Sequence, residues 1–169
     1  MKITSAEAAK LLKKLKEQLN DSLNHEQLSR EFTASLGENP DAVRPEYDYA
    51  AEQKYQAEIE GRIRAVRHAI SMFNLNCEVS GFNMTVDQML VYIPQLTEKK
   101  NKLAEMANKL PKQRKEGSFG TAGIVDYIYA NYDPKRVQED YRAVSDELAK
   151  AQTALDLLNS TELLEVPEA

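Results

Sequence analysis

The sequence has few of the residues that most often carry out chemistry or cross-link a small fold. It contains one cysteine, two histidines, no tryptophan, six glycines and six prolines among 169 residues. A single cysteine, Cys77, excludes an intrachain disulfide and any zinc site that needs two cysteines. We expect Cys77 to be a small buried residue and not a reactive thiol.

Long apolar runs are also missing. The first residues, MKITSAEAAKLLKKLKEQ, place charges where a signal peptide needs a continuous apolar core. No stretch approaches the roughly 20 apolar residues of a membrane span. With 42% hydrophobic and 29% charged residues, the composition is that of an ordinary folded protein. We therefore expect a cytoplasmic protein with a single domain over residues 1–169.

Motifs of catalysis and cofactor binding are lacking too. The sequence has no Gly-x-Ser-x-Gly, His-Glu-x-x-His or dinucleotide-binding pattern. His25 and His68 lie far apart, on different predicted helices, without the close spacing of metal ligands. We therefore assign no catalytic, cofactor-binding or metal-binding residue and expect a protein that is not an enzyme.

Four long helices are predicted from apolar spacing, near residues 4–29, 45–74, 85–111 and 133–160. Thr4 and Thr85 each begin a capping box, Pro45 suits the first turn of the second helix, and Asp133 caps the fourth. The apolar positions recur at alternating steps of four and three, which keeps one seam toward a partner helix. These positions include Ala8, Leu12, Leu15 and Leu19; Ile59, Ile63, Val66, Ile70 and Phe73; Met89, Ile93, Leu96, Leu103, Met106 and Leu110; and Val137, Tyr141, Val144, Leu148, Ala151, Leu155 and Leu158.

Proline interrupts the third predicted helix at residue 94. A proline inside a helix loses one backbone hydrogen bond and clashes with the carbonyl four residues earlier, here that of Leu90. We expect a kink or a short break near Tyr92.

Short alternating stretches predict strands near residues 30–36, 75–79, 124–132 and 161–166. Glycines precede the third of these, but a phosphate-binding loop needs a strand before its glycines and a helix after them. Here the order is reversed, so we interpret residues 117–123 as a connector. The predicted fold is mainly α, an antiparallel bundle of about four long helices with a small β-element at one end.

A basic run is the most unusual charge feature, because the whole chain has a net charge of −5. One interpretation is that these cations complement the dipole at a helix C-terminus. The alternative is a patch for an anionic partner, either a nucleic-acid backbone or an anionic membrane. The run lacks interleaved aromatic residues, which favours the first interpretation and makes a nucleic-acid or membrane partner the less expected one. Its members, opposed only by Glu105, are Lys99, Lys100, Lys102, Lys109, Lys112, Arg114 and Lys115.

Tyrosines cluster in and after the predicted strand at 124–132. An exposed strand edge is rarely left unprotected, so we expect this strand to pair with another one, from this chain or from a second copy. The candidate oligomer interface comprises Tyr127, Tyr129, Tyr132, Tyr141, Val144 and Leu148.

Three segments of the chain form a familiar order of elements: RIRAVRHAISMFN, GFNMTVDQMLVYIPQL and DELAKAQTALDLLNST. Together they resemble the septicolysin-like family of small bacterial helical proteins. The resemblance implies a helical, oligomeric bacterial protein, and it carries over no catalytic residue. The matching positions are Phe73, Asn74, Asn76, Gly81, Thr85, Val86, Asp156 and Asn159.

The sequence thus favours a non-enzymatic, self-associating helical binding or scaffold protein that forms homo-oligomers. A membrane-active, cytolysin-like protein is the alternative. The third possibility is an enzyme that acts on small molecules, or a helical arm that binds nucleic acid.

Overall fold

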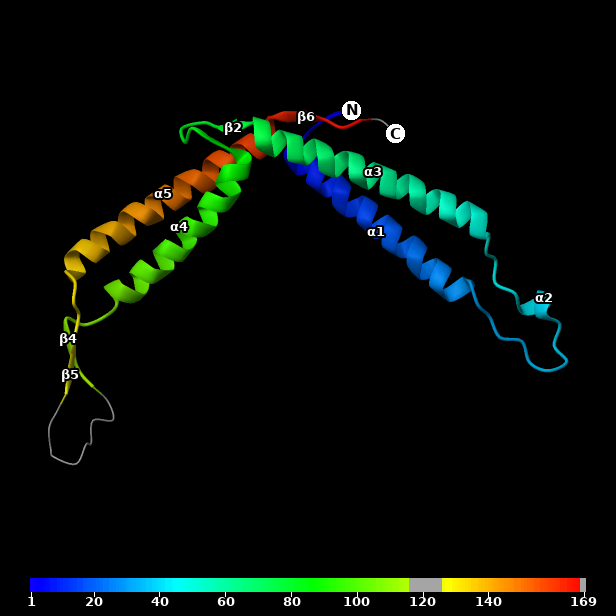
Figure 1. Cartoon of the computed structure of the whole chain (residues 1–169), viewed down its shortest axis with the longest axis horizontal. Coiled ribbons are helices and arrows are strands. Elements are labelled where there is room, and N and C mark those ends of the chain that lie inside the picture. Colours follow the sequence, from blue (N-terminus) through cyan, green and yellow to red (C-terminus); the bar gives the residue numbers. More distant parts are fainter. Residues whose placement is uncertain (116–125, 168–169) are drawn as a thin grey trace. The chain divides into compact units, whose positions relative to one another are not determined.

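The structure is a computed structural model that describes residues 1–115 and 126–167. It is mainly α-helical with short strands, which confirms the predicted fold class (Figure 1). The helices are α1 (Ser5–Ser29), α2 (Pro40–Val43), α3 (Tyr49–Asn76), α4 (Val86–Ala107) and α5 (Pro134–Thr161). The strands are β1 (Lys2–Thr4), β2 (Glu78–Val79), β3 (Met84–Thr85), β4 (Lys112–Arg114), β5 (Tyr127–Tyr129) and β6 (Leu163–Glu165).

The chain divides into two compact units. Unit 1 consists of residues 1–77 together with the segment from residue 158 onward, and unit 2 of residues 78–157. Unit 1 therefore holds α1, α2, α3 and the strands β1 and β6, while unit 2 holds α4, most of α5 and the other four strands. The expectation of a single domain stays a prediction.

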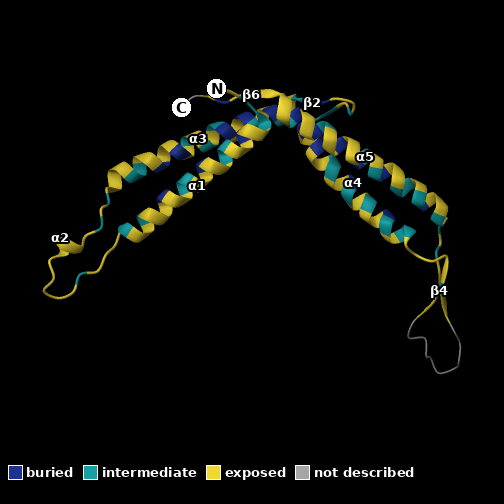
Figure 2. Ribbon diagram, turned by 180° about the vertical axis from the view of Figure 1, so that it is seen from behind, coloured by how far each residue is buried: buried dark blue, intermediate teal, exposed yellow. Residues whose placement is uncertain are grey.

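Each unit is built on two long helices that run side by side in opposite directions, α1 with α3 and α4 with α5 (Figures 1 and 2). Their buried residues recur at steps of seven, or of three and four, the spacing by which paired helices keep one seam in contact. The predicted seams are confirmed except at Leu110, which lies beyond the end of α4 and is 63% exposed. Leu12, Leu19, Ile63 and Ile70 are half-buried at the margins of the seams. The buried positions are Ala8, Leu15 and Ser22; Gln56, Ile59, Val66, Ala69 and Phe73; Val86, Met89, Leu96 and Leu103; and Val137, Val144, Leu148, Ala151, Leu155 and Leu158.

Helix starts follow the caps that the sequence predicts in three of four cases. The Thr4 hydroxyl accepts from the Glu7 N–H at 3.2 Å, and the Glu7 carboxylate accepts from the Thr4 N–H at 2.9 Å. Thr85 and Gln88 form the same reciprocal pair at the start of α4. At α5, the Asp133 carboxylate accepts from the Lys135 N–H at 2.9 Å. These bonds satisfy N–H groups that the first turn of a helix leaves without partners.

The start predicted for the second helix is wrong. Pro45 lies before α3, which begins at Tyr49 behind the N-cap Asp48. The Asp48 carboxylate accepts from the Ala51 N–H at 3.1 Å, a bond that a proline cannot supply. A different proline, Pro40, occupies the first turn of the short helix α2 behind Asn39.

Pro94 does not break the third helix, since α4 runs from Val86 to Ala107 without interruption. The carbonyl that loses its partner belongs to Leu90, a residue that is 49% exposed. Pro94 is itself exposed. Water can therefore solvate the freed carbonyl, which lowers the cost of a proline in the helix interior.

The strands form three separate two-stranded antiparallel ribbons, β1–β6, β2–β3 and β4–β5. In unit 1, β6 confirms the strand predicted near 161–166, and Ile3 pairs with Leu164. The strand predicted at 30–36 is wrong, because no described segment pairs with it. The strand predicted at 75–79 is only partly correct: α3 continues to Asn76, Cys77 caps it with extended backbone, and only Glu78 and Val79 form a strand, β2.

Replacing the buried Leu15 with alanine tests the seam between α1 and α3. Leu15 is 1% exposed, and removing such a side chain leaves a cavity that destabilises a protein by about 2–5 kcal/mol. Leu28→Ala is the control, because Leu28 lies on the same helix and is 80% exposed. Urea denaturation followed by circular dichroism measures the free energy of unfolding. It should fall markedly in Leu15→Ala and change by no more than about 0.5 kcal/mol in the control. Equal losses would contradict the assigned seam.

Candidate functional site

The ribbon of β4 and β5 brings the two candidate sets of the sequence together. Lys112 pairs with Tyr129 and Arg114 with Tyr127. Backbone bonds on both sides lengthen the ladder: the Lys115 N–H donates to the Asp126 carbonyl and the Ala130 N–H to the Pro111 carbonyl, each at 3.0 Å. Residues 111–115 and 126–130 therefore form one continuous ribbon.

Because side chains alternate along a strand, the paired residues of β4 and β5 fall on two faces. One face carries Lys112, Arg114, Tyr127 and Tyr129, which we call the cation–tyrosine face. The other carries Gln113 and Ile128. Cations and aromatic rings, which the sequence keeps apart, are thus interleaved across the ribbon.

The cation–tyrosine face is open to solvent and ordered by its own contacts. Tyr127 is 47% exposed and Tyr129 62% exposed, and the ribbon is largely exposed in Figure 2. The Lys112 ammonium lies 4.2 Å from the ring centre of Tyr127 and 5.4 Å from that of Tyr129. The two ring centres are 6.5 Å apart. Cation–π attraction of this kind holds the lysine over the rings.

The sequence suggested that the basic run lies at the C-terminal end of one helix, but the structure distributes it over a helix, a loop and a strand. Helix α4 ends at Ala107 and carries no basic residue in its last turn, so the run does not complement a helix C-terminus. Among the described residues, none of the seven cations forms an ion pair with a carboxylate. Lys99, Lys100 and Lys102 lie on α4, Lys109 follows the helix, Lys112 and Arg114 lie in β4, and Lys115 comes directly after β4.

The remaining residues of the candidate oligomer interface lie within unit 2. The Tyr132 hydroxyl donates to the Met106 carbonyl at 2.8 Å. Tyr141 is half-buried, and Val144 and Leu148 are buried. Of the six residues of the candidate oligomer interface, only Tyr127 and Tyr129 are therefore exposed. The glycine-rich connector at 117–123 lies outside the described residues.

A polar cluster joins α1 to the start of α3, and no sequence pattern predicted it. The Glu26 carboxylate accepts from the Tyr47 hydroxyl at 2.8 Å and from the side-chain amides of Gln53 and Gln56 at 2.8 and 2.9 Å. The bonds from Gln56 and Tyr47 lower the pKa of Glu26. Partial burial and the bond to Glu26 raise the pKa of Tyr47 to about 12.

Beside this cluster, Ser22, His25 and Glu52 come close but do not form a catalytic triad. The Ser22 hydroxyl donates to Glu52 and not to the histidine. His25 Nδ1 lies 3.9 Å from the other oxygen of Glu52. In the Ser-His-Asp arrangement the serine hydroxyl is hydrogen-bonded to the histidine, which is not the case here, so this cluster is a contact between α1 and α3.

Glu26→Gln should reduce the acid sensitivity of unit 1. The folded-state pKa of Glu26 is lowered from 4.5, so its stabilising effect is present above pH 4.5 and is lost as pH falls through the lowered value. We expect the variant to be less stable at pH 7 and to lose less stability than the unmodified protein on acidification to pH 3. Urea midpoints across this range measure both, with the exposed Glu17→Gln as control. Parallel pH profiles for Glu26→Gln and the unmodified protein would contradict the assignment.

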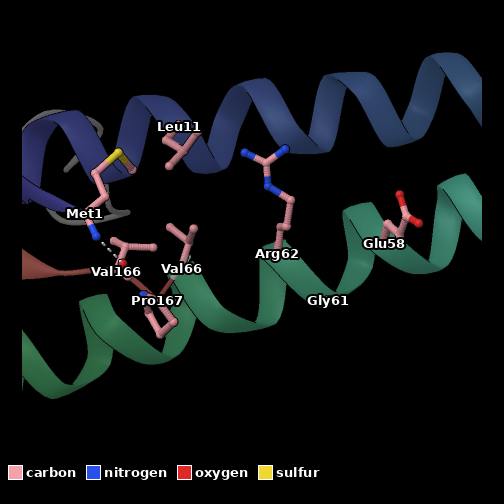
Figure 3. A pocket seen from close by; sticks show the side chains of 8 residues that line it. All are labelled: Met1, Leu11, Glu58, Gly61, Arg62, Val66, Val166 and Pro167. Carbon is pink, nitrogen blue, oxygen red and sulfur yellow. Dashed lines mark hydrogen bonds between the residues drawn. The ribbon is translucent and has the colours of Figure 1, made fainter. Parts of the chain in front are cut away.

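A groove of about 760 Å³ lies in unit 1 between α1, α3 and the terminal segments (Figure 3). Leu11, Val66 and Val166 give it an apolar lining, and the Arg62 side chain extends from α3 toward α1. The Met1 amino group donates to the Val166 carbonyl at 2.9 Å and so fixes one end. Among the described residues that line the groove, the charged groups are the Arg62 guanidinium, the Met1 amino group and the Glu58 carboxylate.

Gly61 lies at this groove inside α3, where glycine weakens a helix. A Cβ added there would lie 3.8 Å from the Arg64 guanidinium, an ordinary contact. Gly61→Ala should therefore stabilise the protein by about 0.5–1 kcal/mol. Urea denaturation measures the gain, and a loss of stability would show that the groove needs the space.

Within residues 1–115 and 126–167, no three His, Cys, Asp or Glu side chains gather as metal ligands would. In the same ranges, no helix has the length and apolar character needed to cross a membrane.

Comparison with known proteins identifies a protein that shares the fold, but it identifies no activity. No protein-family model matches the chain, and the septicolysin-like resemblance stays a prediction. A curated relative, the transcription factor bHLH100 of Arabidopsis thaliana, is 28% identical over 114 residues, which are 68% of this chain and 44% of that protein. The crystal structure of a functionally unknown conserved protein from Corynebacterium diphtheriae matches with a TM-score of 0.61 and 14% identity, covering 98% of this chain and 100% of the other. The chain therefore shares its fold with that bacterial protein.

Proposed function

We propose that this is a non-enzymatic binding or scaffold protein of the cytoplasm that self-associates through the β4–β5 ribbon. The observation that carries the proposal is the exposure of a regular ribbon whose residues are large, aromatic or charged. Tyr127, Ile128 and Tyr129 are all close to half exposed or more. Such side chains are typical of contact surfaces and uncommon on a strand that faces only water.

Backbone geometry supports pairing at the β5 edge. Bonds to β4 use the backbone of Asp126 and Ala130, so the alternation of an antiparallel ladder directs the N–H and C=O groups of Tyr127 and Tyr129 away from β4. No third strand pairs with the ribbon among the described residues. A second copy of β5 can add to this edge and satisfy both sets of groups.

Twofold symmetry fits this contact, since two identical edges meet in an antiparallel arrangement. It also places the Lys112 and Arg114 side chains of both copies on one enlarged sheet. Like charges on that sheet repel, so we expect self-association to strengthen as added salt screens them.

Tyr127→Lys combined with Tyr129→Lys should shift the protein toward monomers. The added ammonium groups extend the like-charge repulsion along the contact, while the helical seams stay intact. Multi-angle light scattering over a series of protein concentrations measures the mass, and far-ultraviolet circular dichroism checks the helicity. Tyr49→Lys combined with Tyr55→Lys is the matched control, because both tyrosines are exposed on α3 in unit 1.

A pair of variants separates the edge from the side chain. Tyr129→Pro removes a backbone N–H that points away from β4 and leaves the ladder bonds at residues 126 and 130 available, whereas Tyr129→Ala removes the same ring and keeps the N–H. Loss of the dimer in the proline variant but not in the alanine variant supports edge pairing. A monomeric unmodified protein at every concentration would refute self-association and favour a pocket-bearing monomer.

A membrane-active, cytolysin-like protein is the second candidate, because the seven cations of the basic run, which form no ion pair with a described carboxylate, lie close in sequence to the exposed tyrosines. Binding to anionic vesicles at low salt, lost in Lys112→Gln, Arg114→Gln and Lys115→Gln together, would favour it over the scaffold.

A further inference from the structure

We infer that the cation–tyrosine face of the β4–β5 ribbon binds single-stranded nucleic acid. The inference rests on the proposal that the ribbon is a contact surface, and it names the partner of one face. Self-association uses the strand edge, so the face with Lys112, Arg114, Tyr127 and Tyr129 stays open in the dimer.

Charge is the first argument. The chain as a whole is acidic, with a net charge of −5, yet residues 99–115 carry seven cations against Glu105 alone. None of these cations forms an ion pair with a described carboxylate. Their charge is therefore available to an external polyanion, which gains by releasing its counterions.

The geometry of the tyrosine rings is the second argument, and it favours single-stranded nucleic acid over other polyanions. Proteins that hold single strands combine cations along the backbone with aromatic rings on which bases stack. Here the Tyr127 and Tyr129 ring centres lie 6.5 Å apart on the face that also carries the cations. Lys112 lies over both rings, so a phosphate that draws this ammonium away exposes the rings to bases.

The composition of the two faces disfavours a membrane as the partner. Insertion into a bilayer surface buries a continuous apolar face that is rich in Leu, Phe or Trp. The aliphatic residue of the ribbon, Ile128, pairs with Gln113 on the opposite face. The cations thus share their face with tyrosines only, whose rings can stack on the faces of bases while their hydroxyls form hydrogen bonds.

The test is fluorescence anisotropy of a labelled oligothymidylate with the full chain, at about 50 mM salt and across a salt series. We expect binding that falls with salt. Lys112→Gln with Arg114→Gln should reduce the slope of log K against log salt by about 1.4, since each phosphate contact on a single strand contributes about 0.7. Lys10→Gln with Lys14→Gln is the matched control, because it removes two exposed cations from α1 and should leave the slope unchanged.

Stacking is tested by Tyr127→Ala and Tyr129→Ala, each of which should weaken binding about tenfold while the salt slope stays the same. Phenylalanine at either position should keep the affinity, because it retains the ring. Matched duplex DNA should bind more weakly than the single strand, since its bases are already stacked. Equal affinity for the duplex with no effect of the alanine variants would overturn the inference, and so would binding to anionic vesicles without binding to the oligonucleotide.

Light scattering on the same samples keeps the two proposals apart. A monomer that binds the oligonucleotide with the expected dependence on tyrosine refutes self-association alone. A dimer that fails to bind the oligonucleotide refutes the nucleic-acid inference alone.

Discussion

The rest of the structure depends on one constraint, the burial of apolar side chains along one seam of each long helix. In each unit two helices run antiparallel, and buried residues such as Leu15 and Val66 in unit 1, or Leu96 and Leu148 in unit 2, supply the apolar seam. A single amphipathic helix gains little stability alone, so pairing is what makes α1, α3, α4 and α5 persist. The strands are short because they only join or terminate these helices.

Pairing of two helices leaves most of each helix surface in water, and this explains where polar contacts occur. Between α1 and α3 the seam continues beyond its apolar part as Ser22, Gln56 and the bonds received by Glu26. Between α4 and α5 the Tyr92 hydroxyl donates to Glu147 at 3.2 Å. Such bonds hold the register of a helical pair at positions where water would otherwise compete.

The β4–β5 ribbon differs from the rest because its side chains are not used for burial. Helix α4 ends at Ala107 and α5 begins at Pro134, and the ribbon lies on the chain between them. Tyr127 and Tyr129 contribute no core contact that would explain their size. Their position beside Lys112 and Arg114 gives the ribbon the chemistry of a contact surface.

Sequence alone determined the features that depend on local pattern: the four long helices, three of their caps and the seams along them, since periodicity and capping act within a few residues. It also located Tyr127 to Tyr129 in a strand. Only the tertiary structure decided what pairs with what. Lys112 to Arg114 became a strand because Tyr127 to Tyr129 lie opposite, and residues 30–36 stayed irregular because no described strand lies beside them. The groups that donate to Glu26 belong to residues 21 to 30 positions further along the chain. No local sequence pattern predicts these contacts, because they form only when α1 and α3 pack together.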